Sequence, residues 1–353
     1  AWILASGPLW FLAILLAVTG APRGSVRAFL PLFTIAAVVV LLVWIAAVRF
    51  LLWGERPKDP LSDPTSFGML VYLALVPTVH WWLCQRGPLF GGSRLAVACQ
   101  LGFNVTVLLA FTVAIGTASR ANVALLSLAV GLWIVLGSLR KLNLQRAVLI
   151  AVLGVLGLGL AGLQSRAVTT TLSQDLRSDS ATEQRWLLLE AGASLAREHA
   201  PWGIGLFGFG LEYPAIRSAE DQSSAGIYVH NDYLQLAAEG GVVFLLPLLA
   251  LVIGVATLVL RRLRLLERER WCDARGGGAI ALGLCLLHAC VTFVFYTLSV
   301  VIVMGVVAAW CFFPLGEPRK EAAVPALTQS PKLRVSGLLA WWGALAFAWL
   351  NLG

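Results

Sequence analysis

His230 is the residue of this chain best suited to acid–base chemistry. It begins the run His230-Asn-Asp-Tyr-Leu-Gln-Leu-Ala-Ala-Glu-Gly-Gly241. Asn231 or Asp232 can cap a short helix that ends at the two glycines. His230 then stands at the helix N-terminus, where the positive end of the helix dipole disfavours an imidazolium. Because a general base must be uncharged, His230 is a candidate catalytic base, with a plain helix-capping histidine as the alternative.

Two arginines, Arg120 and Arg185, are candidates for binding phosphate. Arg120 ends the run Thr117-Ala-Ser-Arg120 and opens an apolar segment, whereas Arg185 lies in a helical stretch rich in Leu and Ala. A guanidinium presents a planar fork of donors that matches phosphate oxygens. The simpler alternatives are an Arg120 that reaches lipid headgroups and an Arg185 on a solvated helix face. With His230, the two arginines predict a site for a phosphate-linked substrate.

The composition of the chain predicts a membrane protein. Of the 353 residues, 59% are hydrophobic and only 12% are charged, whereas a soluble domain carries about 25% charged residues. The mean hydropathy is +0.84, and 14 tryptophans suit the interfacial belts of a bilayer protein. The net charge of +8 comes from short basic runs between apolar segments. It therefore indicates membrane topology, and no nucleic-acid partner is expected.

Apolar segments long enough to cross a bilayer recur along the sequence. A helix of about 17–25 apolar residues spans about 30 Å of hydrocarbon. The continuous apolar run 277–315 is too long for one span and is divided near Tyr296. The first segment lacks a charged n-region, so it is not interpreted as a signal peptide. The predicted spans are 2–18, 28–53, 67–83, 95–118, 120–137, 147–163, 241–260, 277–296, 298–315 and 335–352.

These segments predict an all-α integral membrane protein with about ten transmembrane helices and one long, partly helical periplasmic loop. Its parts are N-terminal helices 1–163, the loop with the catalytic segment 164–240, and C-terminal helices 241–353. Lys and Arg concentrate in the connections on one side, which predicts the cytoplasmic side. The loop 54–66 and the connection 164–240 then face the opposite side. The clearest basic connections contain Arg140, Lys141 and Arg146; Arg261, Arg262, Arg264, Arg268 and Arg270; and Arg319, Lys320, Lys332 and Arg334.

The connection 164–240 is far longer than helix packing requires, and loops of this length are usually functional or disordered. Ser180-Ala-Thr-Glu183 has the pattern of a capping box, so a helix is expected from Gln184 to His199. Pro201 ends it, and the run Trp202-Gly-Ile-Gly-Leu-Phe-Gly-Phe-Gly210 predicts a tight backbone path at the membrane surface. Its glycine spacing is not the dinucleotide-binding fingerprint. The loop is therefore expected to be ordered and to carry the function.

The chain resembles the O-antigen ligase and O-antigen polymerase superfamily of bacterial membrane glycosyltransferases. The resemblance rests on the His230–Gly241 run, on Ser119-Arg120 and on Pro201-Trp-Gly-Ile-Gly205, and it covers roughly residues 95–315. A long periplasmic loop between spans in the C-terminal half also agrees with the family. One departure concerns a later span, in which relatives carry His followed by Asp-Phe. Here His288 is followed by Val291-Thr-Phe293 without an aspartate, which puts a role for His288 in doubt.

The resemblance implies transfer of a glycan from an undecaprenyl diphosphate carrier to an acceptor hydroxyl at the periplasmic face of the bacterial inner membrane. His230 would activate the hydroxyl, and Arg120 and Arg185 would hold the diphosphate, with inversion at the anomeric carbon. No metal and no cofactor are implied, and the sequence has neither a CxxC nor a His/Cys cluster. Besides the carrier-linked donor, the expected partners are lipid A–core, or another glycan acceptor, and membrane lipids.

Several functions stay open on the sequence alone. An O-antigen ligase that uses lipid A–core is favoured over a polymerase of O-antigen or exopolysaccharide and over a protein O-oligosaccharyltransferase. The alternative of another class is a transporter or flippase for lipid-linked sugars. A transporter places charged groups and broken helices near the bilayer midplane. Here the spans are nearly free of charge and the polar residues gather in one loop, which favours an enzyme.

Overall fold

A computed structural model describes residues 26–57, 63–84, 94–139, 142–173, 180–221, 225–264 and 274–312. Every regular element in these ranges is a helix, and none of them contains a strand. The chain divides into two compact units, 1–316 and 317–353, and all the described ranges lie in the first. The predicted all-α class is confirmed for this part of the chain. The predicted spans 2–18 and 335–352 lie outside the described residues.

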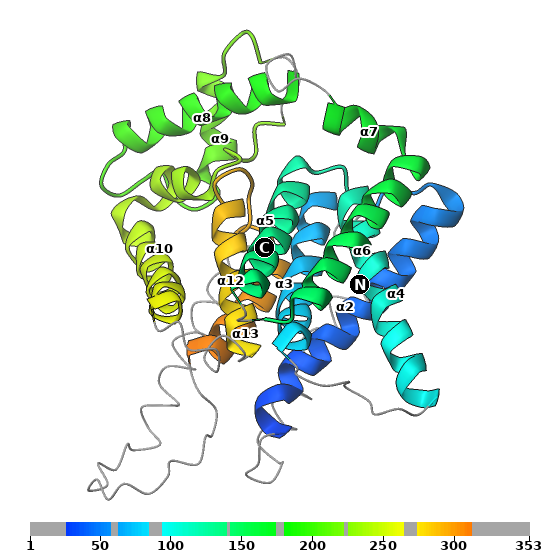
Figure 1. Cartoon of the computed structure of the whole chain (residues 1–353). Coiled ribbons are helices and arrows are strands. Elements are labelled where there is room, and N and C mark those ends of the chain that lie inside the picture. The colour runs from blue at the N-terminus through cyan, green and yellow to red at the C-terminus, as the bar shows by residue number, and fades with distance from the viewer. Residues whose placement is uncertain are drawn as a thin grey trace, which may run out of the picture. The chain divides into compact units, whose positions relative to one another are not determined.

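Seven helices form a bundle that shares one hydrophobic core (Figure 1). The helix α3 is the centre of this bundle, because it packs against α2, α4, α5, α12 and α13 and most of its side chains are buried. A helix that is apolar on all sides belongs in such a position. The seven helices are α2 (Val26–Trp53), α3 (Pro64–Cys84), α4 (Arg94–Gly116), α5 (Arg120–Ser138), α6 (Leu144–Gln164), α12 (Ala274–His288) and α13 (Leu298–Phe312).

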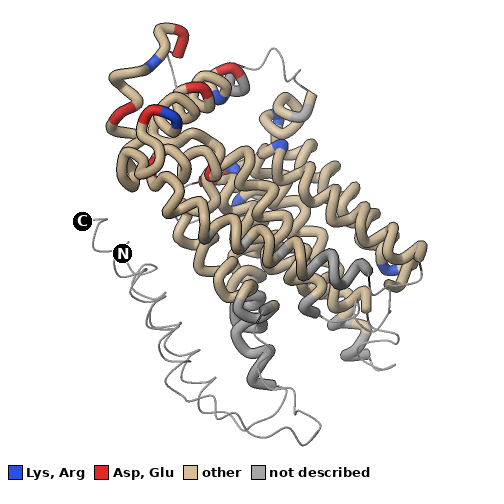
Figure 2. Tube along the Cα trace, turned by 90° about the vertical axis from the view of Figure 1, so that its left-hand side faces the viewer, with Lys and Arg blue, Asp and Glu red and all other residues tan. Residues whose placement is uncertain are grey.

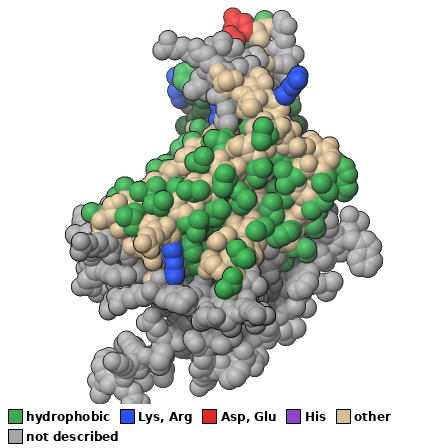
Figure 3. Space-filling model, turned by 45° about the vertical axis from the view of Figure 1, so that its right-hand side comes forward, with side chains coloured by type: hydrophobic (Ala, Val, Ile, Leu, Met, Phe, Trp, Pro, Cys, Tyr) green, Lys and Arg blue, Asp and Glu red, His purple; other side chains and the backbone are tan. Residues whose placement is uncertain are grey.

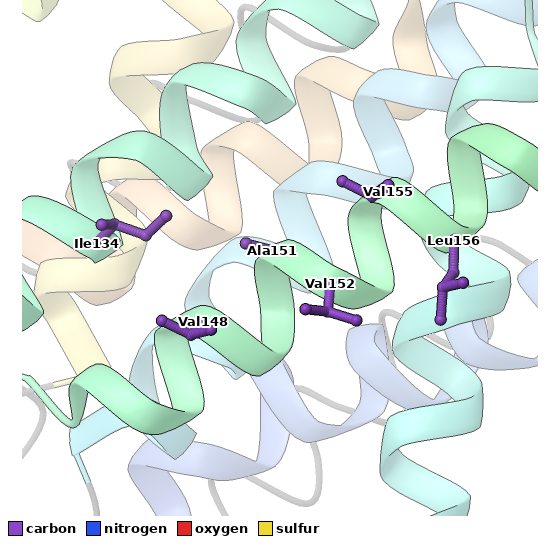
Figure 4. A pocket seen from close by; sticks show the side chains of 6 residues that line it. All are labelled: Ile134, Val148, Ala151, Val152, Val155 and Leu156. Atoms are coloured by element: carbon purple, nitrogen blue, oxygen red, sulfur yellow. The ribbon is translucent and has the colours of Figure 1, made fainter.

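The outer surface of the bundle at α5 and α6, which we call the flank, is apolar, as is the core. Exposed aliphatic side chains follow α6 along its outer face, among them Val152, Val155 and Leu163, and Figure 3 shows hydrophobic side chains spread over this side. A shallow groove between α5 and α6 is lined entirely by aliphatic residues (Figure 4). Soluble monomers rarely expose continuous apolar patches of this extent. The flank is therefore a surface suited to lipid.

Three described helices are long and apolar enough to cross a membrane, namely α3, α5 and α6. A fourth span is obtained if the bent pair Asp232–Leu246 and Leu248–Gly254 counts as one. The predicted spans 28–53, 95–118, 277–296 and 298–315 overlap shorter apolar helical segments among the described residues, namely Leu41–Trp53, Gln100–Gly116, Gly276–His288 and Leu298–Ala308. The membrane-helix character of the chain is thus confirmed, while the count of about ten spans is not.

The connection after α6 is folded and carries its own small core. It contains α7 (Arg166–Ser173), α8 (Ser180–Glu198), α9 (Gly208–Ile216) and the first turns of α10 (Asp232–Arg264). The predicted helix after Ser180 is therefore confirmed. This loop unit lies at one end of the bundle (Figure 1), and Figure 2 shows most of the described charged residues gathered at that end. Its core consists of Leu188, Leu195, Phe209, Tyr213, Val229 and Ala238.

The prediction of a helical span over 277–296 is wrong in its second half. The helix α12 ends at His288, residues 289–297 are non-helical, and α13 begins at Leu298. The start of α10 supplies the reason, because the Asp232 amide donates to the Ala289 carbonyl at 2.8 Å. The Asn231 side-chain amide donates to the Cys290 carbonyl at 3.0 Å. Tertiary hydrogen bonds thus satisfy backbone groups that a continuing helix would have used.

Candidate functional site

His230 stands where the loop unit turns into α10. Its backbone is in the left-handed region, with φ at 60°, a conformation that is uncommon for residues other than glycine. The Asn231 side chain accepts the Leu234 amide at 3.0 Å, so the predicted cap is Asn231. The first part of α10 ends at Gly241, whose φ of 55° and ψ of −147° break the helix. The expected short helix that ends at the glycines is confirmed.

The His230 ring is half-buried and electrically neutral at physiological pH. Its pKa falls from the usual 6.5 to about 4, chiefly because burial disfavours the imidazolium and next because of the positive charge of Arg185. The carboxylate of Asp63 acts in the opposite direction. The ring lies 5.3 Å from the Phe293 ring, centroid to centroid, and its Nδ1 is buried without a hydrogen-bond partner. An uncharged imidazole was the expectation at this position.

Arg185 reaches the histidine from α8, which packs against the first part of α10. Gly192 makes this packing close, since a Cβ there would lie 2.9 Å from a methyl group of Val229. Arg185 itself is exposed, and its charge acts on His230. The structure therefore brings the charge of Arg185 to bear on His230, two of the three residues that the sequence singled out.

Arg120 begins α5 at the same end of the bundle. Ser119 caps the helix, with its side chain accepting the Asn122 amide. The Arg120 Nε donates to the Thr171 carbonyl of α7 at 2.7 Å. Two residues on, the buried Asn122 side chain donates to the Thr65 carbonyl at 3.3 Å. Arg120 is thus anchored through its Nε between the loop unit and the bundle.

Asp63 connects the start of α3 with the neighbourhood of His230. Its carboxylate caps α3 by accepting the amides of Thr65 and Ser66, the latter at 2.7 Å, together with the Ser66 hydroxyl. The Ser66 hydroxyl also lies 3.1 Å from the Thr297 hydroxyl. Because the Asp63 charge acts on His230, the starts of α3, α5 and α10 meet at one end of the molecule.

A buried carboxylate, Glu239, holds this end together, and sequence reasoning missed it. Glu239 is 1% exposed and accepts four hydrogen bonds from three parts of the chain, an arrangement that we call the Glu239 clasp. The Gln235 side chain also accepts the Val229 amide at 3.0 Å, so the clasp reaches the residue before His230. The four donors are the Phe207 amide (2.9 Å), the Phe209 amide (3.4 Å), the Gln235 side-chain amide (3.0 Å) and the Tyr296 hydroxyl (2.5 Å).

The glycine-rich segment after Pro201 runs directly along the first part of α10. The amides of Ile204 and Gly205 donate to the carbonyls of Ala238 and Glu239, at 2.9 and 2.8 Å. Gly203 has a φ of 77°, and a Cβ there would lie 2.4 Å from the Glu239 carbonyl oxygen. Only glycine fits so close an approach. The tight path expected from the alternating glycines is confirmed as a backbone-to-backbone contact.

Comparison with known proteins supports the family resemblance. Residues 105–249 match the family model described as O-antigen ligase. This part of the chain is similar to O-antigen ligases. Neither the curated proteins nor the solved structures give a match.

The matched region 105–249 contains Arg120, Arg185 and His230, whereas α12 and α13 lie beyond it. These two helices still contribute to the site through residues 289–297. His288, whose role was in doubt, is completely buried at the end of α12. Its Nδ1 lies 3.0 Å from the Tyr72 hydroxyl, which ties α12 to the central helix α3. His288 therefore has a structural role, because this contact holds α12 against α3.

Proposed function

We propose that the chain transfers a glycan from an undecaprenyl diphosphate carrier to an acceptor hydroxyl, with His230 as general base. The observation that carries the proposal is a neutral histidine beside Arg185, inside the region that is similar to O-antigen ligases. The favoured acceptor is lipid A–core, which would make the protein an O-antigen ligase of the bacterial inner membrane with its site facing the periplasm.

His230 takes up a proton in this proposal. Because Nδ1 is buried, Nε2 is the ring nitrogen that an acceptor hydroxyl can reach. The hydroxyl proton passes to Nε2 while its oxygen forms a bond to the anomeric carbon. The bond from that carbon to the diphosphate breaks, and its electron pair leaves with the diphosphate oxygen. Attack opposite the leaving group inverts the anomeric configuration.

Arg120 and Arg185 stabilise the leaving group. A diphosphate gains negative charge as it departs, and guanidinium groups placed where this charge develops lower the barrier. Arg120 is anchored through Nε, which fixes the direction of its planar fork. A fixed fork requires less reorganisation during reaction than a free side chain. The charge can thus be balanced by side chains of this chain, in line with the expected metal independence.

Transfer is tested with full-length protein reconstituted in vesicles and supplied with one carrier-linked glycan donor. Lipid A–core, a second carrier-linked donor and a serine-containing peptide are offered as acceptors in separate reactions. We expect glycosylated lipid A–core, formed by the wild type and abolished in His230→Ala. Full transfer by His230→Ala, in protein that remains folded and inserted, would remove the base assignment.

The product of this experiment separates the alternatives. A lengthened carrier-linked glycan identifies a polymerase, and a modified peptide identifies a protein O-oligosaccharyltransferase. Movement of the donor across the vesicle membrane without any new glycosidic bond identifies a transporter. Most charged residues in the described part of the chain lie at one end of the bundle (Figure 2), which favours an enzyme, because transporter sites lie near the bilayer midplane.

A further inference from the structure

Five rings form a continuous row that ends at the candidate base. Phe207 meets Tyr296 edge-to-face at 5.6 Å between centroids, and Tyr296 lies 5.6 Å from Tyr228. Tyr228 stacks on Phe293 at 4.5 Å, and Phe293 lies 5.3 Å from His230. The members come from the glycine-rich segment, the residues before α10 and the turn 289–297. We call these residues the aromatic row.

The aromatic row is distinct from the core of the loop unit. That core contains Phe209 and Tyr213, both almost fully buried, whereas Phe207 of the row is 42% exposed and the other four members are partly exposed. Large rings kept at a polar, accessible surface are characteristic of recognition sites. The row also lies beside charged residues, since the Tyr296 hydroxyl donates to Glu239 and the charge of Arg185 acts on His230.

We infer that the aromatic row binds the sugar rings of the acceptor glycan and leads its hydroxyl to His230. The inference rests on the proposed function, and it names the class of acceptor and the residues that recognise it. The C–H bonds on one face of a pyranose are slightly positive and pack well on the negative face of an aromatic ring. Tyrosine adds a hydroxyl that can bond to the sugar's own hydroxyls.

An acceptor glycan fits this row better than a lipid chain does. The groove on the flank (Figure 4) is lined only by aliphatic side chains of α5 and α6 and offers a polyprenyl chain or a membrane lipid an entirely apolar surface. The row instead combines aromatic rings and the Tyr228 hydroxyl with a neutral histidine, which suits a ligand that is part apolar and part hydroxylated. The donor diphosphate, in turn, requires the guanidinium groups. The acceptor is the reactant whose hydroxyl must reach His230.

The Glu239 clasp holds the row in a fixed shape before any ligand binds. Its carboxylate accepts the Tyr296 hydroxyl and the Phe207 backbone amide, so two of the five rings are attached to one buried group. A preformed surface loses little conformational freedom on binding, and this favours affinity for a weakly interacting ligand such as a sugar.

The inference is tested with Tyr228→Leu and its matched control Tyr228→Phe in the full-length protein. Tyr228→Leu removes the ring but keeps an apolar side chain, whereas Tyr228→Phe keeps the ring. We expect Tyr228→Leu to raise KM for the glycan acceptor by about 3- to 10-fold, the range of one lost aromatic contact, with KM for the donor unchanged. Phe207→Leu, at the far end of the row from His230, should raise the acceptor KM similarly. Tyr228→Phe loses only the hydroxyl, so it should raise the acceptor KM clearly less than Tyr228→Leu does.

Binding without turnover separates this inference from the proposed function. Saturation-transfer NMR with a lipid-free core oligosaccharide should give contacts in the wild type and in His230→Ala, and weaker contacts in Tyr228→Leu and Phe207→Leu. This pattern supports the row even if no transfer is observed, and transfer with unaltered oligosaccharide contacts in both leucine variants overturns it. A change confined to donor KM, or competition by a peptide in place of the oligosaccharide, also overturns it.

Discussion

At the residue scale, the state of His230 is set by its surroundings. An isolated histidine is half protonated near pH 6.5, where it can act as base and as cation. Burial and the Arg185 charge lower the pKa of His230 to about 4. The ring is therefore in its neutral, proton-accepting form throughout the physiological pH range. The helix dipole expected from the sequence also lowers the pKa of His230. In the structure, burial is the main cause of the lowered pKa.

The pH dependence of transfer should reveal this lowered pKa. The base is inactive when protonated, so the rate should be steady from neutral pH downward and fall only near pH 4. Arg185→Gln removes a cation that opposes protonation, and the falling limb should move to higher pH. Arg197→Gln, on the exposed side of the same helix, is the control and should leave the limb in place. A wild-type limb near pH 6.5 in the pH–rate profile would contradict the assignment.

Arg120 should be sensitive to a change that preserves its charge. Arg120→Lys keeps one positive charge but loses the planar fork and the bond from Nε to the Thr171 carbonyl. We expect KM for the carrier-linked donor to rise about tenfold or more, because one to two charge-assisted hydrogen bonds are lost. Steady-state kinetics with varied donor measures the effect.

Arg146→Lys provides a matched control for Arg120→Lys. Arg146 also donates to a backbone carbonyl, that of Trp82 at 2.8 Å, but it belongs to the basic connection at the far end of α5 and α6. Its replacement should leave the donor KM unaltered. Equal effects of the two substitutions would indicate that Arg120 has only a structural role.

At the element scale, Glu239 holds three segments together near His230: the glycine-rich segment, the first part of α10 and the turn 289–297. Glu239→Gln retains the size of the side chain but loses the negative charge and presents an amide to donors. Hydrogen bonds to a charged group contribute about 1.5–3 kcal/mol each, and Glu239 is 1% exposed. We expect a lowered thermal unfolding midpoint and a reduced kcat, with Glu212→Gln on exposed α9 as the control. Unchanged stability and kcat would show that the clasp is dispensable.

The sequence predicted the elements better than the contacts between them. A cap at Asn231, a helix after Ser180 and a break at the glycines are local patterns, and all three are present. The clasp could not be predicted, because Glu239 meets Phe207 and Tyr296, which lie 32 and 57 residues away in sequence. The early end of α12 has the same origin, since Asp232 and Asn231 bind a segment that is apolar enough to be taken for helix.

At the scale of the whole molecule, the described chain separates two environments. The bundle flank is aliphatic (Figure 3), and most of the charged residues in the described ranges gather at one end (Figure 2). A lipid-linked donor requires both, because its polyprenyl tail stays in hydrocarbon while its diphosphate and sugars are in water. This separation follows from composition, which is why it could be predicted from the sequence alone.

The side of the membrane on which the loop unit lies is the remaining prediction. The basic connections predict that 164–240 faces away from the cytoplasm. Single cysteines replace the exposed Glu183 of α8 and Gln145 at the start of α6, in a background whose own cysteines are alanine and which retains transfer. A membrane-impermeant maleimide applied to intact spheroplasts should label position 183 at once and position 145 only after permeabilisation.

The labelling pattern bears directly on the chemistry. Carrier-linked glycans that are completed for export meet their acceptors on the outer side of the membrane, so His230 must lie on the side that position 183 reports. Labelling of position 145 alone in intact spheroplasts would put His230 among cytoplasmic groups and away from lipid A–core in the outer leaflet. Transfer to that acceptor would then be impossible, whatever the state of the histidine.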